Sequence, residues 1–352
     1  MKHFFNILTI DSHTLQFIQI ENKNNLLSLK HDETKVYEEP IILGEMGTQS
    51  LADVDVLEND LKALLLRGQT SSDREIYLIL PDSQIKSFFI PLENIAKEHI
   101  NANYLRFRIK KALSQEVQPN HLFDFVPLNQ SQNSCTFLVH AISESFLNQV
   151  QKLLENLGWT LASATPTSVN LYNVFDGPKF YPRDRIIIDG GMEVTTMSFF
   201  QKGILKYLRV IEVAGQHMLK GVCSNQKLKL ADARKMLFEE NLLPGSQEEL
   251  LQSFAKLGQV SQVFGNWFRE VSLTMQFYQE NYPIEEEETI FITGLLARIP
   301  NIIRIISKLL NKEVHLLRLD DKFFQHKKDP EDQWMLVPAF GKVIGFTGED
   351  RS

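Results

Sequence analysis

Residues 186–196 have the sequence Ile-Ile-Ile-Asp-Gly-Gly-Met-Glu-Val-Thr-Thr. Its three isoleucines predict a buried strand, because β-branched apolar side chains pack well within a sheet. Asp189 closes the strand, and the pair Gly190-Gly191 predicts a tight turn into a second strand, from Val194 to Phe200. Taken alone, the pattern fits a hairpin that grips phosphate and an ordinary glycine-rich hairpin about equally well.

The same arrangement opens the chain. An apolar run ends at Ile10-Asp11, and a second apolar run from Leu15 to Ile20 follows after a polar turn. Between the two copies, Asp176 to Asp184 holds two prolines and one glycine, which predicts a linker. We therefore predict a duplicated α/β chain whose two lobes are residues 1–175 and 185–352.

Length and charge limit the class of protein. The chain has 352 residues, enough for two domains, with 43% hydrophobic and 23% charged residues and a net charge of −7. An acidic chain has no general attraction to nucleic acid, so we expect no nucleic-acid partner. No apolar run reaches the roughly 18–20 residues that cross a bilayer, so we expect a cytoplasmic protein that meets the membrane through a partner.

The first lobe is predicted to contain an inserted module. Between residues of about 82 and 160 the order strand–helix–strand–strand–helix fits a small α+β unit. The elements are expected at residues 84–90, 95–117, 122–128, 135–141 and 146–157.

The helix expected at 95–117 carries a basic stretch interleaved with two aromatic residues. Such a stretch could be a nucleic-acid or membrane footprint. We favour a surface helix whose aromatic side packs in the core and whose basic side faces water, because the whole chain is acidic. The residues concerned are Tyr104, Arg106, Phe107, Arg108, Lys110 and Lys111.

Catalytic and metal-binding patterns are scarce. The nine histidines are scattered without H-E-x-x-H spacing, and there is no G-x-S-x-G sequence. Cys135 and Cys223 are isolated, so two cysteines alone predict neither a zinc site nor a disulfide framework. The run from Glu285 to Glu288 is expected to be an exposed loop before a strand. We therefore predict no catalytic residue and no metal site.

Six segments in order, the 186–196 stretch among them, resemble proteins of the PilM type, which assemble type IV pili. The resemblance extends more distantly to the cell-division protein FtsA and spans nearly the whole chain. The five further segments are Gly203 to Met218, Ala231 to Lys235, Phe268 to Tyr278, Ile292 to Pro300 and Val337 to Gly345.

The resemblance implies a two-lobed actin-like fold, a duplicated RNase H-like architecture with the inserted module in the place of subdomain 1C. In that fold two β-hairpins grip the phosphates of ATP through backbone amides at glycine-rich turns. It implies nucleotide-site positions at Asp11, Asp189, Gly190, Gly191, Thr195, Gly215, Lys235, Gly294 and Gly341.

Departures from the family pattern predict a degenerate nucleotide site. The first loop, Asp11 to Gln16, has no glycine and ends in Gln16 where the family has lysine. Leu295 and Leu296 follow Gly294, where leucines would crowd a nucleotide. We expect a pseudo-ATPase, not an enzyme, and leave weak binding of ATP and Mg open as an alternative.

The function implied by the resemblance is that of a cytoplasmic scaffold at the inner membrane. Such proteins bind the N-terminal tail of a PilN-like membrane protein in a groove between subdomains 1A and 1C, and link the platform to the pilus motor. Three alternatives stay open: a GspL-like component of a type II secretion system, an active actin-like ATPase, and an unrelated α/β enzyme. Homo-oligomerisation and the groove residues are left open as well.

Overall fold

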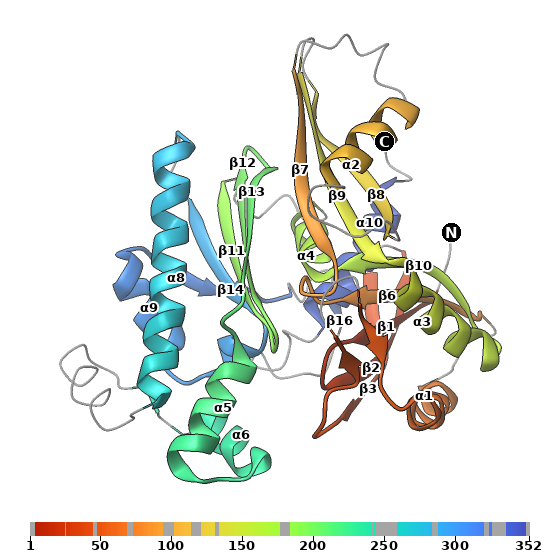
Figure 1. The fold of residues 1–352 in the computed structure, drawn as a ribbon, viewed down its shortest axis with the longest axis horizontal. Coiled ribbons are helices and arrows are strands. Elements are labelled where there is room, and N and C mark those ends of the chain that lie inside the picture. The colour runs from red at the N-terminus through yellow and green to blue at the C-terminus, as the bar shows by residue number, and fades with distance from the viewer. Residues whose placement is uncertain are drawn as a thin grey trace. The chain divides into compact units, whose positions relative to one another are not determined.

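The computed structural model describes most of the chain (Figure 1). The described residues are 4–24, 26–44, 48–68, 73–93, 102–113, 121–130, 134–176, 184–240, 242–243, 259–283, 288–319, 324–325 and 336–349.

The N-terminal half is built on a six-stranded sheet with the order β10-β6-β1-β2-β3-β16. Strands β1 and β10 both pair in parallel with β6, which places Leu8 beside Leu78 and Ala164 beside Leu78 on the other side. Strands buried on both faces are rich in apolar residues, as β6 is. In β1 the apolar sequence is interrupted by Asn6, which is fully buried and accepts a hydrogen bond from the side chain of Gln19 at 2.8 Å. The strands are β1 (Phe4–Ile10), β2 (Thr14–Lys23), β3 (Leu26–Val36), β6 (Glu75–Leu80), β10 (Thr160–Pro166) and β16 (Phe324–Gln325).

Two helices complete the core of this sheet. Helix α1 (Val54–Gly68) and helix α3 (Glu144–Asn156) each bury one apolar side against it. Ser143 caps the start of α3 by accepting a hydrogen bond from the amide of Phe146, and Gly158 follows its end with a φ of +74°. The sequence pattern places α3 in the inserted module, whereas the buried side chains of α3 belong to the core of the larger sheet.

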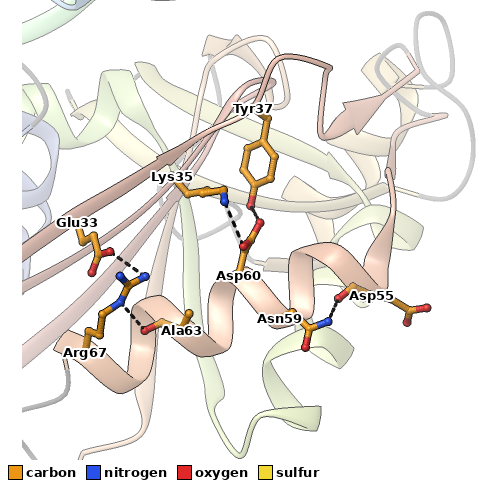
Figure 2. Close-up of polar contacts among 8 residues, drawn as sticks. All are labelled: Glu33, Lys35, Tyr37, Asp55, Asn59, Asp60, Ala63 and Arg67. Carbon is orange, nitrogen blue, oxygen red and sulfur yellow. Dashed lines mark hydrogen bonds and ion pairs between the residues drawn. The ribbon is translucent and has the colours of Figure 1, made fainter.

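Polar contacts join the exposed end of β3 to α1 (Figure 2). The hydroxyl of Tyr37 donates to Asp60 at 2.9 Å, and Lys35 lies 3.4 Å from the same carboxylate. Arg67 forms an ion pair with Glu33 at 2.9 Å. Exposed pairs of this kind contribute roughly 0–1 kcal/mol each, so they orient α1 while the apolar contacts hold it.

The inserted module has a core of its own. Strands β7 (Lys86–Glu93), β9 (Ser134–Ser143) and β8 (His121–Gln130) form an antiparallel sheet in the order β7-β9-β8. Helix α2 (Ala102–Leu113) packs Leu105 and Ile109 onto one face of it (Figure 1). The rest of the helix predicted at 95–117 lies outside the described residues.

The C-terminal half contains a five-stranded sheet with the order β13-β12-β11-β14-β15. Strands β11, β12 and β13 form an antiparallel meander, while β14 pairs in parallel with both β11 and β15. The strands are β11 (Arg185–Gly190), β12 (Thr195–Gln201), β13 (Ile204–Ile211), β14 (Thr289–Thr293) and β15 (Val314–Leu316).

One large apolar cluster joins this sheet to its helices, with Phe199, Phe264, Trp267 and Tyr278 buried at its centre. The sequence from Glu248 to Glu280 predicts a long helix, and the structure describes this helix from residue 259 onward. The earlier part of that range lies outside the described residues. The helices are α5 (Gly215–Gln226), α6 (Leu230–Glu239), α8 (Gln259–Asn281) and α9 (Ile302–Leu310), with a 3-10 helix η2 (Leu295–Arg298) before α9.

By their contacts the residues divide into two compact units. One unit comprises Phe4–Gln19 and Lys30–Thr167, which includes the inserted module. The other comprises Ile20–Leu29 and the residues from Ser168 onward. The end of the β2–β3 hairpin falls in the second unit, where β16 pairs with β3 through Phe324 and Leu27.

Helix α4 (Thr167–Asp176) and helix α10 (Val337–Glu349) make a close contact in the second unit. A methyl group on Gly341 would overlap the backbone carbonyl oxygen of Asn170, and one on Gly345 would lie 2.5 Å from the amide nitrogen of the Asn173 side chain. Two glycines four residues apart thus present a bare backbone strip to α4. The close approach of the helices depends on that strip.

The glycine strip generates a matched pair of substitutions. Gly341→Ala should lower the free energy of unfolding by about 1–3 kcal/mol, because backbone cannot yield to an added methyl as a side chain can. Gly265→Ala, in the middle of α8 with nothing within 4 Å of the new methyl, should raise it by about 0.5–1 kcal/mol through helix propensity. Urea unfolding followed by circular dichroism measures both. Equal stability of the two variants would contradict the packing described for α10.

Candidate functional site

The glycine-rich turn after β11 meets the turn after β14. Asp189 and Gly190 end β11, and the amide of Gly191 donates to the carbonyl of Val194 at 3.0 Å, closing the hairpin. Gly294, with a φ of +80°, lies so close that a methyl on it would be 2.6 Å from the carbonyl oxygen of Gly190 and would overlap the Asp189 carboxylate. The two strand ends therefore lie backbone against backbone.

Two leucines fill the space beside these glycines. Leu295 and Leu296 are 6% and 0% exposed, directly after Gly294. A methyl on Gly190 would lie 2.6 Å from the Cβ of Leu296, and one on Gly215 would lie 3.2 Å from a Cδ of Leu295. Apolar side chains of the protein thus occupy the hollow that the glycines leave open.

The N-terminus of α5 closes the other side of the hairpin. The amides of Gly215 and Gln216 donate to the carbonyls of Gly191 at 3.1 Å and Met192 at 2.8 Å. Amides at a helix start are ordinarily free to attract an anion, but these two are bonded to the hairpin. His217 Nδ1 accepts the amide of Ala214 at 3.3 Å, and burial lowers the pKa of this imidazole, with a smaller contribution from Lys220.

The remaining predicted positions of this unit have structural contacts of their own. Thr195 is buried, donates to the carbonyl of Val213 at 3.0 Å and accepts from the indole of Trp267 at 2.8 Å, so its hydroxyl faces the core. Lys235 lies on the exposed side of α6. Gly341 packs against α4. The contacts bring Asp189, Gly190, Gly191, Gly215 and Gly294 together.

The first loop, in the other unit, is closed by its own aspartate. One carboxylate oxygen of Asp11 accepts the amides of His13 at 2.8 Å and Thr14 at 2.7 Å, and the other accepts the Thr14 hydroxyl at 2.7 Å. The amide of Asp11 in turn donates to the carbonyl of Thr14 at 3.1 Å. These three amides, which the resemblance would aim at a phosphate, are bonded within the turn.

Gln16, at the position where the family has lysine, is part of a cross-strand network. It is 4% exposed, donates to Asp32 at 2.7 Å and lies 3.2 Å from the hydroxyl of Thr9. Its amide therefore joins β1, β2 and β3 and supplies no charge. As the loops stand, a triphosphate does not fit the donors of either unit. Among the described residues, no three His, Cys, Asp or Glu side chains gather as a metal site.

Known protein families and curated proteins offer no match to the sequence. Solved structures do match the fold: a PilM–PilN type IV pilus biogenesis complex superposes with a TM-score of 0.76 at 14% identity, covering 98% of this chain and 97% of the other. The chain has an actin-like fold. MreB5 of Spiroplasma citri bound to ADP gives 0.54 at 12% identity with 98% of each chain covered. The ethanolamine utilization protein EutJ from Carboxydothermus hydrogenoformans gives 0.52 at 11% identity, covering 90% and 85%.

Within this actin-like fold the inserted module has a second face that sequence patterns did not reveal. On β8, Phe123 and Phe125 pack toward α2, so Leu122, Asp124 and Val126 point to the opposite side. Both sets contain apolar residues, so the period of two that marks a half-buried strand is hidden. Leu122 and Val126 are 41% and 47% exposed.

A polar row crosses this second face. Ser87, His140 and Asp124 are direct cross-strand neighbours on β7, β9 and β8. The Ser87 hydroxyl lies 2.8 Å from His140 Nδ1, while His140 Nε2 is buried without a hydrogen-bond partner among the described residues. Burial lowers the pKa of His140 to about 4, although Asp124 acts in the opposite direction. The imidazole is therefore neutral near pH 7.

An apolar row lies next to it. Phe89, Leu138 and Val126 are paired across the same three strands, with Leu138 buried, Phe89 half-buried and Val126 exposed. The face thus places a polar row, which includes the exposed carboxylate of Asp124, beside an apolar row.

No helix in the described part of the chain is both long and apolar enough to cross a bilayer.

The pKa of His140 predicts a pH dependence. Because the folded pKa of about 4 is below the ordinary value of 6.5, the unfolded state binds the proton more readily, so stability falls as pH drops below 6.5. Between about pH 7 and pH 5 the wild type should lose roughly 2 kcal/mol more than His140→Gln, which cannot take up this proton. Urea unfolding at both pH values measures it. Parallel losses in the two proteins would show that His140 titrates normally.

Proposed function

We propose that this chain is a scaffold of a type IV pilus assembly platform, which binds the N-terminal tail of a PilN-like membrane protein and does not turn over ATP. The observation that carries the proposal is the likeness to the PilM–PilN complex, with a TM-score of 0.76 over nearly the whole of both chains. MreB5 and EutJ, which share the actin-like fold, reach only 0.54 and 0.52.

The second face of the inserted module supports a peptide partner. Its exposed apolar residues, Leu122 and Val126, lie on the same side of one strand, so their spacing matches that of side chains on one side of an extended peptide that runs along the strand. We infer that the tail docks on this face.

The two loops support the absence of ATP turnover. Phosphoryl chemistry depends on backbone amides and cations placed around the phosphates. Here the amides of His13 and Thr14 are bonded to Asp11, and the start of α5 is bonded to Gly191. Leu296 packs directly on Gly190. We infer that this chain keeps the actin-like fold as a rigid support for protein partners.

Peptide binding can be measured on an array of synthetic N-terminal tails from PilN-like proteins. At least one tail should bind, and Val126→Asp should weaken its binding by at least about tenfold, because a carboxylate would be buried against an apolar peptide. Leu66→Asp is the matched control: Leu66 is 68% exposed on α1, away from the module, and its variant should bind as the wild type does. No captured tail, or a Val126→Asp variant with full affinity, would refute the proposed function.

Nucleotide binding can be measured by thermal shift with millimolar ATP and magnesium. A site with a dissociation constant a hundredfold below the ATP concentration would stabilise the protein by about 2.7 kcal/mol, which is readily seen. We expect no shift in the wild type. A shift that Asp189→Asn removes would mean that the glycine-rich hairpin binds ATP, and the chain would then be a nucleotide-dependent member of the fold.

A further inference from the structure

The outward face of α2 combines positive charge with an exposed aromatic ring. Leu105 and Ile109 bury the inner face, at 4% and 0% exposure. The outer face is formed by five exposed side chains: Asn103, Arg106, Phe107, Lys110 and Lys111. The described range of α2 contains no acidic residue, although the whole chain has a net charge of −7.

Phe107 overturns part of the sequence expectation for this helix. Tyr104 packs against the core of the module, as expected for the aromatic side. Phe107 is 63% exposed and stands among the cations on the side expected to face only water. Burying a phenylalanine side chain is favourable by roughly 1.5–3 kcal/mol, so a partner that covered this ring would gain free energy of binding.

The chemistry of the face selects the kind of partner. Lysine is depleted from the buried parts of protein–protein interfaces, and here two lysines and an arginine surround the ring. Single-stranded nucleic acid is held by several stacking rings, and this face offers one. An anionic bilayer accepts both groups at once, because the ring enters the acyl boundary while long basic side chains extend to the phosphates.

We propose that the outer face of α2 binds the surface of an anionic membrane, with Phe107 inserted below the headgroups. The 12-residue helix is about 18 Å long, so it lies along the interface and does not cross the bilayer. Each basic residue near such a surface contributes attraction that is lost with added salt. The remainder of the acidic chain is repelled, which turns the α2 side of the inserted module toward the lipid. The proposal does not depend on the peptide partner.

Vesicle sedimentation of the purified full chain tests this without any protein partner. The wild type should bind vesicles of phosphatidylcholine with phosphatidylglycerol, should not bind phosphatidylcholine alone, and should be released at about 0.5 M salt. Lys110→Gln with Lys111→Gln should weaken binding about twentyfivefold, at roughly fivefold for each charge. Phe107→Ser should weaken it at least about tenfold.

Control variants carry the same changes elsewhere. Leu66→Ser removes an apolar side chain that is 68% exposed on α1, and Lys62→Gln with Lys152→Gln removes two exposed lysines from α1 and α3. Both should bind vesicles as the wild type does. Loss of binding in these controls equal to that in the α2 variants would overturn the proposal, since it would reflect total charge or general stickiness.

Insertion of the ring has its own readout. In Phe107→Trp, fluorescence should shift to the blue on anionic vesicles and should be quenched by brominated lipid more than in the wild type. Binding that depends on the lysines but not on Phe107, and that an oligonucleotide reproduces, would identify the face as a nucleic-acid surface and overturn the proposal. Absence of binding to anionic vesicles at low salt would overturn it as well.

Discussion

The backbone contact between the turn after β11 and the turn after β14 is the constraint on which the C-terminal half depends. Gly294 lies so close to Gly190 that a methyl group on it would be 2.6 Å from the Gly190 carbonyl oxygen, and this approach fixes how two parallel strands end side by side. A methyl group on Gly190 is excluded by Leu296, which packs directly on it. The start of α5 is bonded to the same turn through Gly215 and Gly191, so the position of that helix follows from the turn. Leu296, in the 3-10 helix η2 that precedes α9, fills the space beside Gly190.

This constraint also changes what the glycines mean. In a site that holds phosphate, glycine lets the ligand approach the backbone; in this chain it lets other parts of the chain approach. Asp11 illustrates the same point in the N-terminal half, where a carboxylate takes up the amides of its own turn. In both hairpins, amides of the turn are thus bonded within the protein.

The inserted module exposes apolar residues on two surfaces, one on its sheet and one on its helix. One face of its sheet is closed by α2 over Leu105 and Ile109, and the other presents Leu122 and Val126 beside His140. The outer side of α2 presents the second surface, with Phe107 among cations. A small antiparallel sheet with a helix on one side can present a peptide site and a lipid site on opposite sides, because the core lies between the sheet and the helix and neither site is part of it.

Local patterns in the sequence predicted the repeated strand–aspartate–turn arrangement and the small α+β module, because buried isoleucine runs such as 186–188 and paired glycines have strong local preferences. The actin-like fold was expected from the resemblance of six segments to a known family, and the match to solved structures confirms it. Local patterns did not predict β3, whose polar end from Lys30 to Thr34 pairs only because β2 lies beside it, nor β10 and α4. Glu288, expected in an exposed loop, is 4% exposed, and burial raises its pKa.

Which apolar side chains remain exposed depends on tertiary packing. Leu122 and Phe123 are equally apolar in sequence, and packing of α2 on one of them leaves the other exposed. Phe107 faces outward because Leu105 and Ile109 already fill the core on the inner side of the helix. Likewise, the space beside Gly190 is filled by the side chain of Leu296, a residue far away in the sequence. The conformational preferences of neighbouring residues determine the strands and turns. The side chains that pack against each of these elements come from residues far away in the sequence, so local patterns do not predict them.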